Sequence, residues 1–255
     1  MKRIYTIGKL AIVGLAIGIS QMDLNASQPP AVEQDRVKAA YEEAGPRVRE
    51  LVQDAGLVYP AKRIFIRAFK AENELEIWGS NSGEKPMKLI HTYKIARASG
   101  TLGPKRRQGD LQVPEGFYHV DRFNPKSLFH LSLGLNYPNT SDRILSDKEK
   151  PGADIFIHGN QVSIGCMAMT DEKIKEIYLM ALGARDQGQT KIPVHIFPFR
   201  MTTGTMAKYG QSYADDPIMI AFWSDLKPIY DKFQKSKRVP QVKVDAKGRY
   251  RLASK

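Results

Sequence analysis

The stretch "IHGNQVSIGCMAMTDE", residues 157–172, holds the chain's single cysteine, Cys166, and one of its five histidines, His158. Eight extended residues would span about 26 Å, so the backbone must turn back before a thiol and an imidazole can meet. Gly159 and Asn160 are turn residues that tolerate a positive φ. We therefore expect a strand that ends at His158 and a turn that returns Cys166 to its side.

The surroundings of Cys166 suit a nucleophilic thiol. An adjacent imidazolium lowers a thiol pKa, and we expect His158 to supply this effect. Gly165 carries no side chain, so the backbone N–H groups of Gly165 and Cys166 could form an oxyanion hole. Two other interpretations stay open. Cys166 could be a core residue beside a structural histidine, or it could bind zinc with His158 and a third ligand, although no two candidate ligands show metal spacing such as H-x-x-x-H.

The composition is that of a soluble globular protein. Of 255 residues, 42% are hydrophobic and 26% are charged, which fits one sizeable domain with appendages or two small domains. The formal net charge of +12 favours anionic partners such as envelope polymers, acidic lipid head groups or carboxylate-bearing substrates. Nucleic acid is not an expected partner, because no basic stripe is interleaved with stacking aromatic residues.

The first 26 residues are predicted to be a secretory signal peptide. Lys2, Arg3 and Lys9 precede the apolar run "LAIVGLAIGI" at 10–19, which is too short to span a bilayer but suits a signal sequence. Ala26 offers a cleavage point, and the alternative is an uncleaved anchor. Removing residues 1–26 leaves a net charge of +10, and no later apolar run predicts a stable membrane span. A lone cysteine is unusual in a secreted chain, where cysteines are normally paired.

Beyond the signal peptide we expect helices around a β-rich centre. Residues 32–55 have helical spacing in two pieces, interrupted at Gly45-Pro46, and we expect this segment to pack outside the main domain. Thr170 can cap a helix whose buried stripe would include Ile174 and Ile177, with Tyr178 and Ala181 continuing it. Residues 217–236 predict a last helical region with a kink or restart at Pro228, and residues 242–252 predict a hairpin.

Seven short runs with period-two alternation predict a twisted β-sandwich or a barrel-like sheet. The other four histidines, which are His91, His119, His130 and His195, lie within these runs and are interpreted as strand residues. The predicted strands are residues 62–69, 73–80, 89–96, 116–123, 128–135, 154–159 and 192–199.

The stretch at 157–172 resembles the His-Gly and S-x-G-C signature of the YkuD-type L,D-transpeptidase catalytic domain family. The segments at 99–143, 196–202 ("IFPFRMT") and 222–233 ("FWSDLKPIYDKF") resemble the YafK-like, or DpaA-like, branch of that family. The resemblance runs from about Arg63 to Leu252. It implies a fold that is mainly β with α: a YkuD-like β-sandwich or mixed sheet, with a helix after the catalytic cysteine and peripheral helices.

The resemblance also divides the chain into domains. It implies a signal peptide at 1–26, an N-terminal helical segment at 27–61, a catalytic domain at 62–200, and a C-terminal helix and hairpin extension at 201–255. It places the protein in the periplasm.

The family resemblance implies a cysteine enzyme that acts on peptidoglycan stem peptides without a cofactor or metal. Cys166 would be the nucleophile, His158 the general base and then acid, and Gly165 an oxyanion-hole residue. A backbone carbonyl would orient the histidine. Attack would fall on the carbonyl at the L-centre of meso-diaminopimelate. The expected substrate-binding residues are Lys105, Arg106, Arg107, Gly159 and Ser163.

The chain departs from typical family members at Ile164, where many carry a second histidine, and after Cys166, where many carry an arginine. The YafK-like branch shares these departures, and the resemblance to it implies hydrolysis of the amide that links an outer-membrane lipoprotein to diaminopimelate. The alternatives are L,D-transpeptidation, which forms cross-links or protein–peptidoglycan links, and L,D-carboxypeptidase activity. A hypothesis from another class is a non-catalytic module that binds peptidoglycan through its basic face.

Overall fold

The computed structural model describes residues 36–83 and 85–253, and nine strands of this part join one mixed sheet. The order across the sheet is β3-β2-β1-β9-β5-β6-β7-β8-β4. β1 is parallel to β9 and β7 is parallel to β8, whereas the other neighbours are antiparallel. The strands are β1 (Arg63–Phe69), β2 (Glu74–Ser80), β3 (Lys88–Lys94), β4 (Arg97–Ala98), β5 (Gly116–Ser127), β6 (His130–Leu135), β7 (Phe156–His158), β8 (Met167–Ala168) and β9 (Ile192–Phe197).

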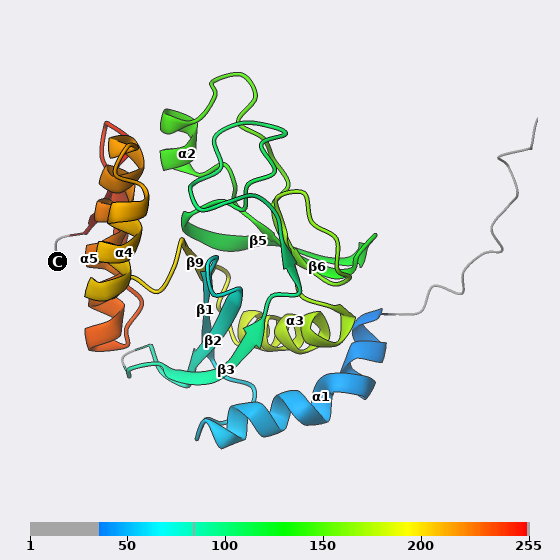
Figure 1. The fold of residues 1–255 in the computed structure, drawn as a ribbon. Coiled ribbons are helices and arrows are strands. Elements are labelled where there is room, and N and C mark those ends of the chain that lie inside the picture. The colour runs from blue at the N-terminus through cyan, green and yellow to red at the C-terminus, as the bar shows by residue number, and fades with distance from the viewer. Residues whose placement is uncertain (1–35, 84, 254–255) are drawn as a thin grey trace, which may run out of the picture. The chain divides into compact units, whose positions relative to one another are not determined.

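Helices lie on both faces of the central strands (Figure 1). Successive side chains of a strand point to opposite faces, and β1 follows this rule. Ile64 and Ile66 belong to the core cluster that includes α3, whereas Phe65 and Phe69 belong to clusters that include α5. The predicted mainly β fold with helices is therefore confirmed. The helices are α1 (Arg36–Asp54), α2 (Thr140–Leu145), α3 (Asp171–Asp186), α4 (Thr203–Ser212) and α5 (Pro217–Ser236).

The predicted break in the N-terminal helix is wrong, because α1 continues through Pro46. Proline inside a helix costs about 3 kcal/mol, so packing must offset this cost. The buried face of α1 includes Ala44 and Val48 on either side of the proline, and it shares one core cluster with α3. The expectation that this segment packs outside the main domain is wrong for the same reason.

The helix after the cysteine agrees with its sequence signals. The Thr170 hydroxyl accepts a hydrogen bond from the backbone N–H of Lys173 at 3.5 Å, and α3 begins at the next residue, Asp171. All four residues of its predicted stripe are buried. Helix α3 packs between the sheet and α1 (Figure 1). It therefore fixes the position of the chain segment that precedes it, which contains Cys166.

Several boundaries differ from the sequence prediction. The strand predicted at 128–135 begins at His130, because Leu128 and Phe129 form a turn, and β5 continues to Ser127. Helix α5 is continuous through Pro228. The C-terminal hairpin is confirmed as β10 (Val242–Val244) and β11 (Tyr250–Leu252). The short elements α2, β4 and β8, and the helix α4, were not among the predicted elements.

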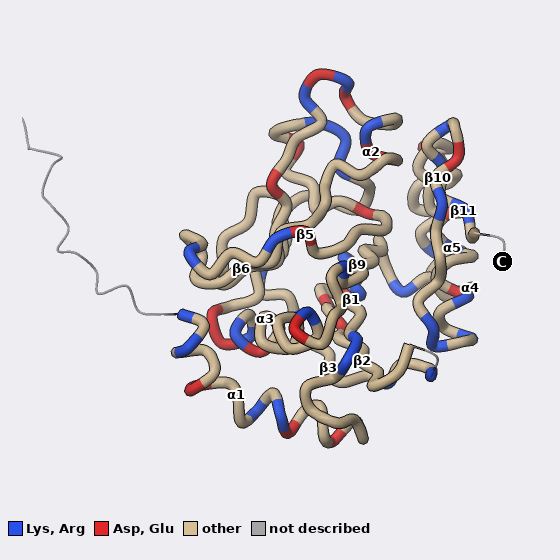
Figure 2. The backbone as a smooth tube through the Cα atoms, turned by 180° about the vertical axis from the view of Figure 1, so that it is seen from behind, with Lys and Arg blue, Asp and Glu red and all other residues tan. Residues whose placement is uncertain are grey.

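Lys and Arg occur on helices, strands and loops, with Asp and Glu positions between them (Figure 2). Within residues 36–83 and 85–253, no helix combines the length and hydropathy that a membrane span needs. The predicted signal peptide at 1–26 lies outside the described residues. The domain limits at 61 and 200 remain predictions.

Candidate active site

The parallel pair β7 and β8 brings His158 and Cys166 to one face of the sheet. In this pair His158 lies opposite Ala168. Cys166 directly precedes β8 and is level with Phe156, whose backbone N–H donates to its Sγ at 3.4 Å. Residues two apart in a strand share a face, which places the Cα atoms of His158 and Cys166 on the order of 8 Å apart. The predicted approach of the two residues is thus explained by strand register.

The chain does not return through a hairpin, because β7 and β8 run in the same direction. Parallel strands usually need a crossover of a dozen residues or more. Here residues 159–166 are enough, because both strands are very short. Asn160 (φ 61°) and Gly165 (φ 128°) take left-handed conformations in this loop, and the Asn160 N–H donates to Asp171 Oδ1 at 2.7 Å. The predicted turn chemistry at Asn160 is confirmed.

The thiol of Cys166 is half-buried and contacts backbone groups. Besides the contact with the Phe156 N–H, the thiol donates a hydrogen bond from Sγ to the carbonyl oxygen of Asp154 at 3.7 Å. Burial raises the pKa of Cys166, and the Phe156 hydrogen bond and the Lys105 charge only partly oppose this effect. The pKa of the thiol is therefore shifted upward, opposite to the lowering that the sequence predicted from an adjacent imidazolium.

The His158 ring is held on two sides. Its Nδ1 atom lies 2.5 Å from the carbonyl oxygen of Gly159. The ring of Phe129 stacks on the imidazole, with centroids 4.7 Å apart and planes at 30°. Burial lowers the pKa of His158, so the imidazole is neutral at rest. A proton on Nδ1 satisfies the Gly159 carbonyl and leaves the Nε2 lone pair to accept a proton.

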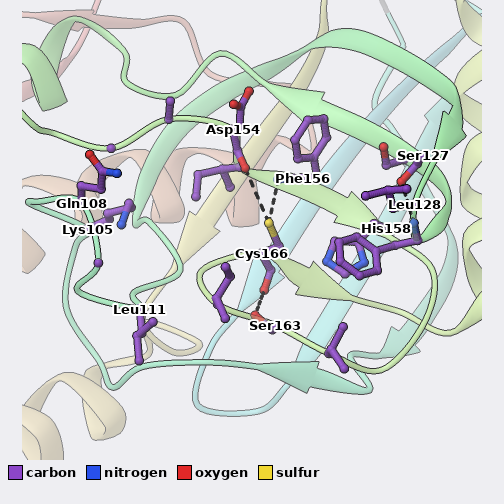
Figure 3. Close-up of a pocket in the computed structure, with 18 of the residues that line it drawn as sticks. Lys105, Gln108, Leu111, Ser127, Leu128, Asp154, Phe156, His158, Ser163 and Cys166 are labelled. Atoms are coloured by element: carbon purple, nitrogen blue, oxygen red, sulfur yellow. Dashed lines mark hydrogen bonds between the residues drawn. The ribbon is translucent and has the colours of Figure 1, made fainter. Parts of the chain in front are cut away.

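His158 and Cys166 line a common cavity of about 940 Å³ (Figure 3). Cys166 lies at its centre, with Lys105 and Leu111 on one side in this view and Ser127 and Leu128 on the other. The remaining lining residues come from the loops at 108–111, 149–155 and 162–164, from strands β5, β6 and β7, and from the turn between β5 and β6. A peptide can therefore reach the thiol from solvent.

The three basic residues predicted to bind substrate are separated by the fold. Lys105 lines the cavity but is only 4% exposed, and its ammonium pairs with Asp110 at 2.6 Å. Arg106 turns toward Asp142, 3.6 Å away, and lies over the ring of Phe222. Arg107 is exposed and does not line the cavity. Of these three residues, only Lys105 lines the cavity in which a substrate could bind.

The three small residues of the motif shape the loop around the cysteine. The Ser163 hydroxyl donates to the Cys166 carbonyl at 2.7 Å and accepts from the Gly165 N–H at 3.3 Å. Gly159 is buried, and a Cβ there would lie 2.5 Å from Asp171 Oδ1. Ser163 also lines the cavity, whereas Gly159 acts on His158 through its carbonyl.

Sequence reasoning missed Phe129 and the two backbone partners of the thiol. The sequence pattern places Phe129 in a strand, and no local pattern signals its contact with His158 at the end of another strand. The remaining histidines lie in β3, β5, β6 and β9, as predicted, and none lines the cavity. In the described part of the chain, no three His, Cys, Asp or Glu side chains are arranged to hold a metal ion.

Comparison with known proteins finds several similar to this chain. A protein of Escherichia coli K12 named "Putative L,D-transpeptidase YafK" is 41% identical over 189 residues, which are 73% of this chain and 72% of the relative. The solved structure of the helical cell shape determining protein Pgp2 from Campylobacter jejuni is 16% identical, with a TM-score of 0.43 over 78% of this chain and 80% of that one. Bdellovibrio bacteriovorus Bd1075 is 21% identical, with a TM-score of 0.38 over 61% and 55%.

The sequence model of the L,D-transpeptidase catalytic domain matches residues 66–196. The match contains both candidate catalytic residues, all of strands β2 to β8, and most of β1 and β9. From this match and the 41% identity over most of both chains, the protein belongs to the YkuD family of L,D-transpeptidase catalytic domains.

Proposed function

We propose that this protein is a periplasmic cysteine hydrolase that acts on peptidoglycan stem peptides at the L-centre of meso-diaminopimelate. Its substrate bond is the amide that links an outer-membrane lipoprotein to diaminopimelate. The observation that carries the proposal is the placement of His158 and Cys166 on one sheet face inside one cavity. Membership of the L,D-transpeptidase family supports peptidoglycan as the substrate class.

Acylation begins with a neutral Cys–His pair. The Nε2 atom of His158 takes the proton of the Cys166 thiol as Sγ attacks the amide carbonyl carbon. The C–N bond then breaks, and the imidazolium returns the proton to the departing amine. The product is a thioester between Cys166 and the carbonyl at the L-centre. The raised pKa of the thiol and the lowered pKa of His158 support this order, because the charged pair forms only during attack.

Deacylation repeats the same proton transfers with water as the nucleophile. His158 takes a proton from water as its oxygen attacks the thioester carbonyl, and the C–S bond breaks with return of the proton to Cys166. An amine in place of water would give transpeptidation, which is the alternative outcome at the same site. Backbone N–H groups of Gly165 and Cys166 would stabilise the oxyanion in both steps. The Gly165 N–H would have to exchange its contact with Ser163 for the substrate oxygen.

The placement of Lys105 suggests its role. Its ammonium pairs with Asp110 and donates to the carbonyl of Arg107 at 2.9 Å, so it holds the 105–110 loop as one wall of the cavity. Its charge also lowers the pKa of the thiol. In this proposal Lys105 belongs to the cavity wall near the substrate, and Arg106 and Arg107 do not contact the substrate directly.

The test uses purified sacculi that carry covalently attached lipoprotein. The wild-type protein should release the lipoprotein, and mass spectrometry of the fragments should show a free amine on the protein and a free carboxylate on diaminopimelate. Cys166→Ala should abolish release while the unfolding temperature stays near the wild-type value. Full release by Cys166→Ala would exclude the proposed nucleophile, and salt-sensitive sacculus binding without release would favour the non-catalytic module.

A further inference from the structure

The start of α1 contacts the hairpin turn between β5 and β6. Arg36, the first residue of α1, donates from Nη1 to the carbonyl oxygens of Ser127 at 2.5 Å and His130 at 2.7 Å. Ser127 ends β5, His130 begins β6, and the two residues are paired in the sheet. One guanidinium nitrogen therefore ties together both ends of a turn that lies far away in the sequence.

This turn forms part of the candidate active site. Its two residues, Leu128 and Phe129, line the cavity, and the Phe129 ring stacks on His158. The Phe129 carbonyl oxygen lies close to Gly159, because a Cβ on Gly159 would be 2.8 Å from it. Gly159 in turn provides the carbonyl at His158 Nδ1. The turn thus contacts both the imidazole face and the residue that orients the ring.

Burial alone holds the turn weakly. Leu128 is 94% exposed and Phe129 is 38% exposed. His130 has a φ of 68°, a left-handed conformation that is unfavourable for a residue with a side chain. Hydrogen bonds from a charged guanidinium to carbonyl oxygens are stronger than those between neutral groups. The Arg36 contacts are therefore well suited to keep this turn in one conformation.

We propose that Arg36 is a positioning residue, which acts through the β5–β6 turn to keep Phe129 against His158 and the imidazole oriented toward Cys166. The role of His158 as the base rests on the proposed function. Arg36 does not act through its charge on the imidazole, since the effects on the pKa of His158 are burial and the Gly159 hydrogen bond. The N-terminal helical segment thereby contributes to the active site as well as to the core.

The kinetic test compares two arginines of one helix. Arg36→Gln should lower kcat for lipoprotein release about ten-fold and change KM less than about two-fold, because geometry and not binding is lost. Arg36→Lys should recover part of kcat, since an ammonium can still donate to one or both carbonyls. Arg47→Gln is the matched control, because Arg47 is exposed and pairs with Glu50 on the same helix. Equal kcat values for Arg36→Gln and Arg47→Gln would overturn the proposal.

A second pair of variants tests the route through the turn. Phe129→Leu should lower kcat as Arg36→Gln does, and the double variant should lose no more than the more damaged single variant. If the two losses multiply, Arg36 does not act through Phe129 and the proposal fails. Thermal unfolding of each variant, with activity assayed well below its midpoint, separates loss of position from loss of the fold.

The last readout needs no substrate. NMR titration of the His158 ring should give a pKa below its ordinary value of 6.5 in the wild type and a higher pKa in Arg36→Gln, because a loosened turn exposes the ring. The same shift in a protein without release activity would support the coupling while the proposed function fails. Release activity with an unchanged His158 titration and unchanged kcat in Arg36→Gln would refute only the coupling.

Discussion

The imidazole of His158 is oriented by the carbonyl oxygen of the next residue, Gly159, at 2.5 Å from Nδ1. A neutral carbonyl fixes the tautomer as a carboxylate would, but it stabilises the imidazolium less. Burial therefore favours the neutral imidazole of His158 and the protonated thiol of Cys166. Four predictions follow from this arrangement of the site.

Replacing the proposed base should remove catalysis. His158→Gln keeps a polar side chain of similar size but cannot accept the thiol proton, so kcat for lipoprotein release should fall at least about 100-fold. His119→Gln is the matched control, because His119 lies on β5 outside the cavity. Steady-state release assays on sacculi measure both variants. Near-normal turnover by His158→Gln would remove this residue from the mechanism.

Gly159 should not tolerate a side chain. In Gly159→Ala the new Cβ would lie 2.5 Å from Asp171 Oδ1 and 2.8 Å from the Phe129 carbonyl oxygen, so the backbone around His158 must shift. We expect a loss of about 1–3 kcal/mol in the free energy of unfolding, together with a loss of activity. Denaturant unfolding measures the first effect. Gly204→Ala on α4, where the Cβ meets nothing within 4 Å, should be at least as stable as the wild type, because alanine favours a helix over glycine.

The free thiol should react as a poor nucleophile at neutral pH. Because burial raises the pKa of Cys166, the thiolate fraction should still be rising as the pH passes the ordinary thiol value of 9.0. The rate of iodoacetamide alkylation should therefore increase across this range without an earlier plateau. A plateau reached near pH 7 would show instead a resting thiolate–imidazolium pair, as the sequence alone had suggested.

Replacing Lys105 should affect the thiol pKa and the stability of the protein, whereas replacing Arg107 should affect neither. Lys105→Gln removes a charge that lowers the pKa of the thiol, so the alkylation profile should move to higher pH. It also leaves Asp110 without its ion-pair partner, and about 1–3 kcal/mol of stability should be lost. Arg107→Gln should change neither property nor KM, because Arg107 does not line the cavity. A large KM increase in Arg107→Gln would restore the original substrate-binding assignment.

Much of the fold could be predicted from local patterns in the chain. The alternation at 62–69 and 192–199 predicted strands, and Thr170 predicted the start of α3, because period and capping are local properties. The same local reasoning failed at Pro46, where burial of one helix face outweighs the cost of a proline. It also failed at Leu128 and Phe129, whose apolar character suggested a strand although they form a turn.

The sequence by itself identified the candidate pair, because the chain has one cysteine, and His158 and turn-forming residues lie within eight positions of it. Only the tertiary structure decided the direction in which burial shifts the two pKa values, the contact of Phe129 with His158, and the separation of Lys105 from Arg106 and Arg107. The physical reason is that burial, stacking and strand register arise between segments distant in the chain. Residue spacing predicts only local structure, such as strands, turns and helix caps.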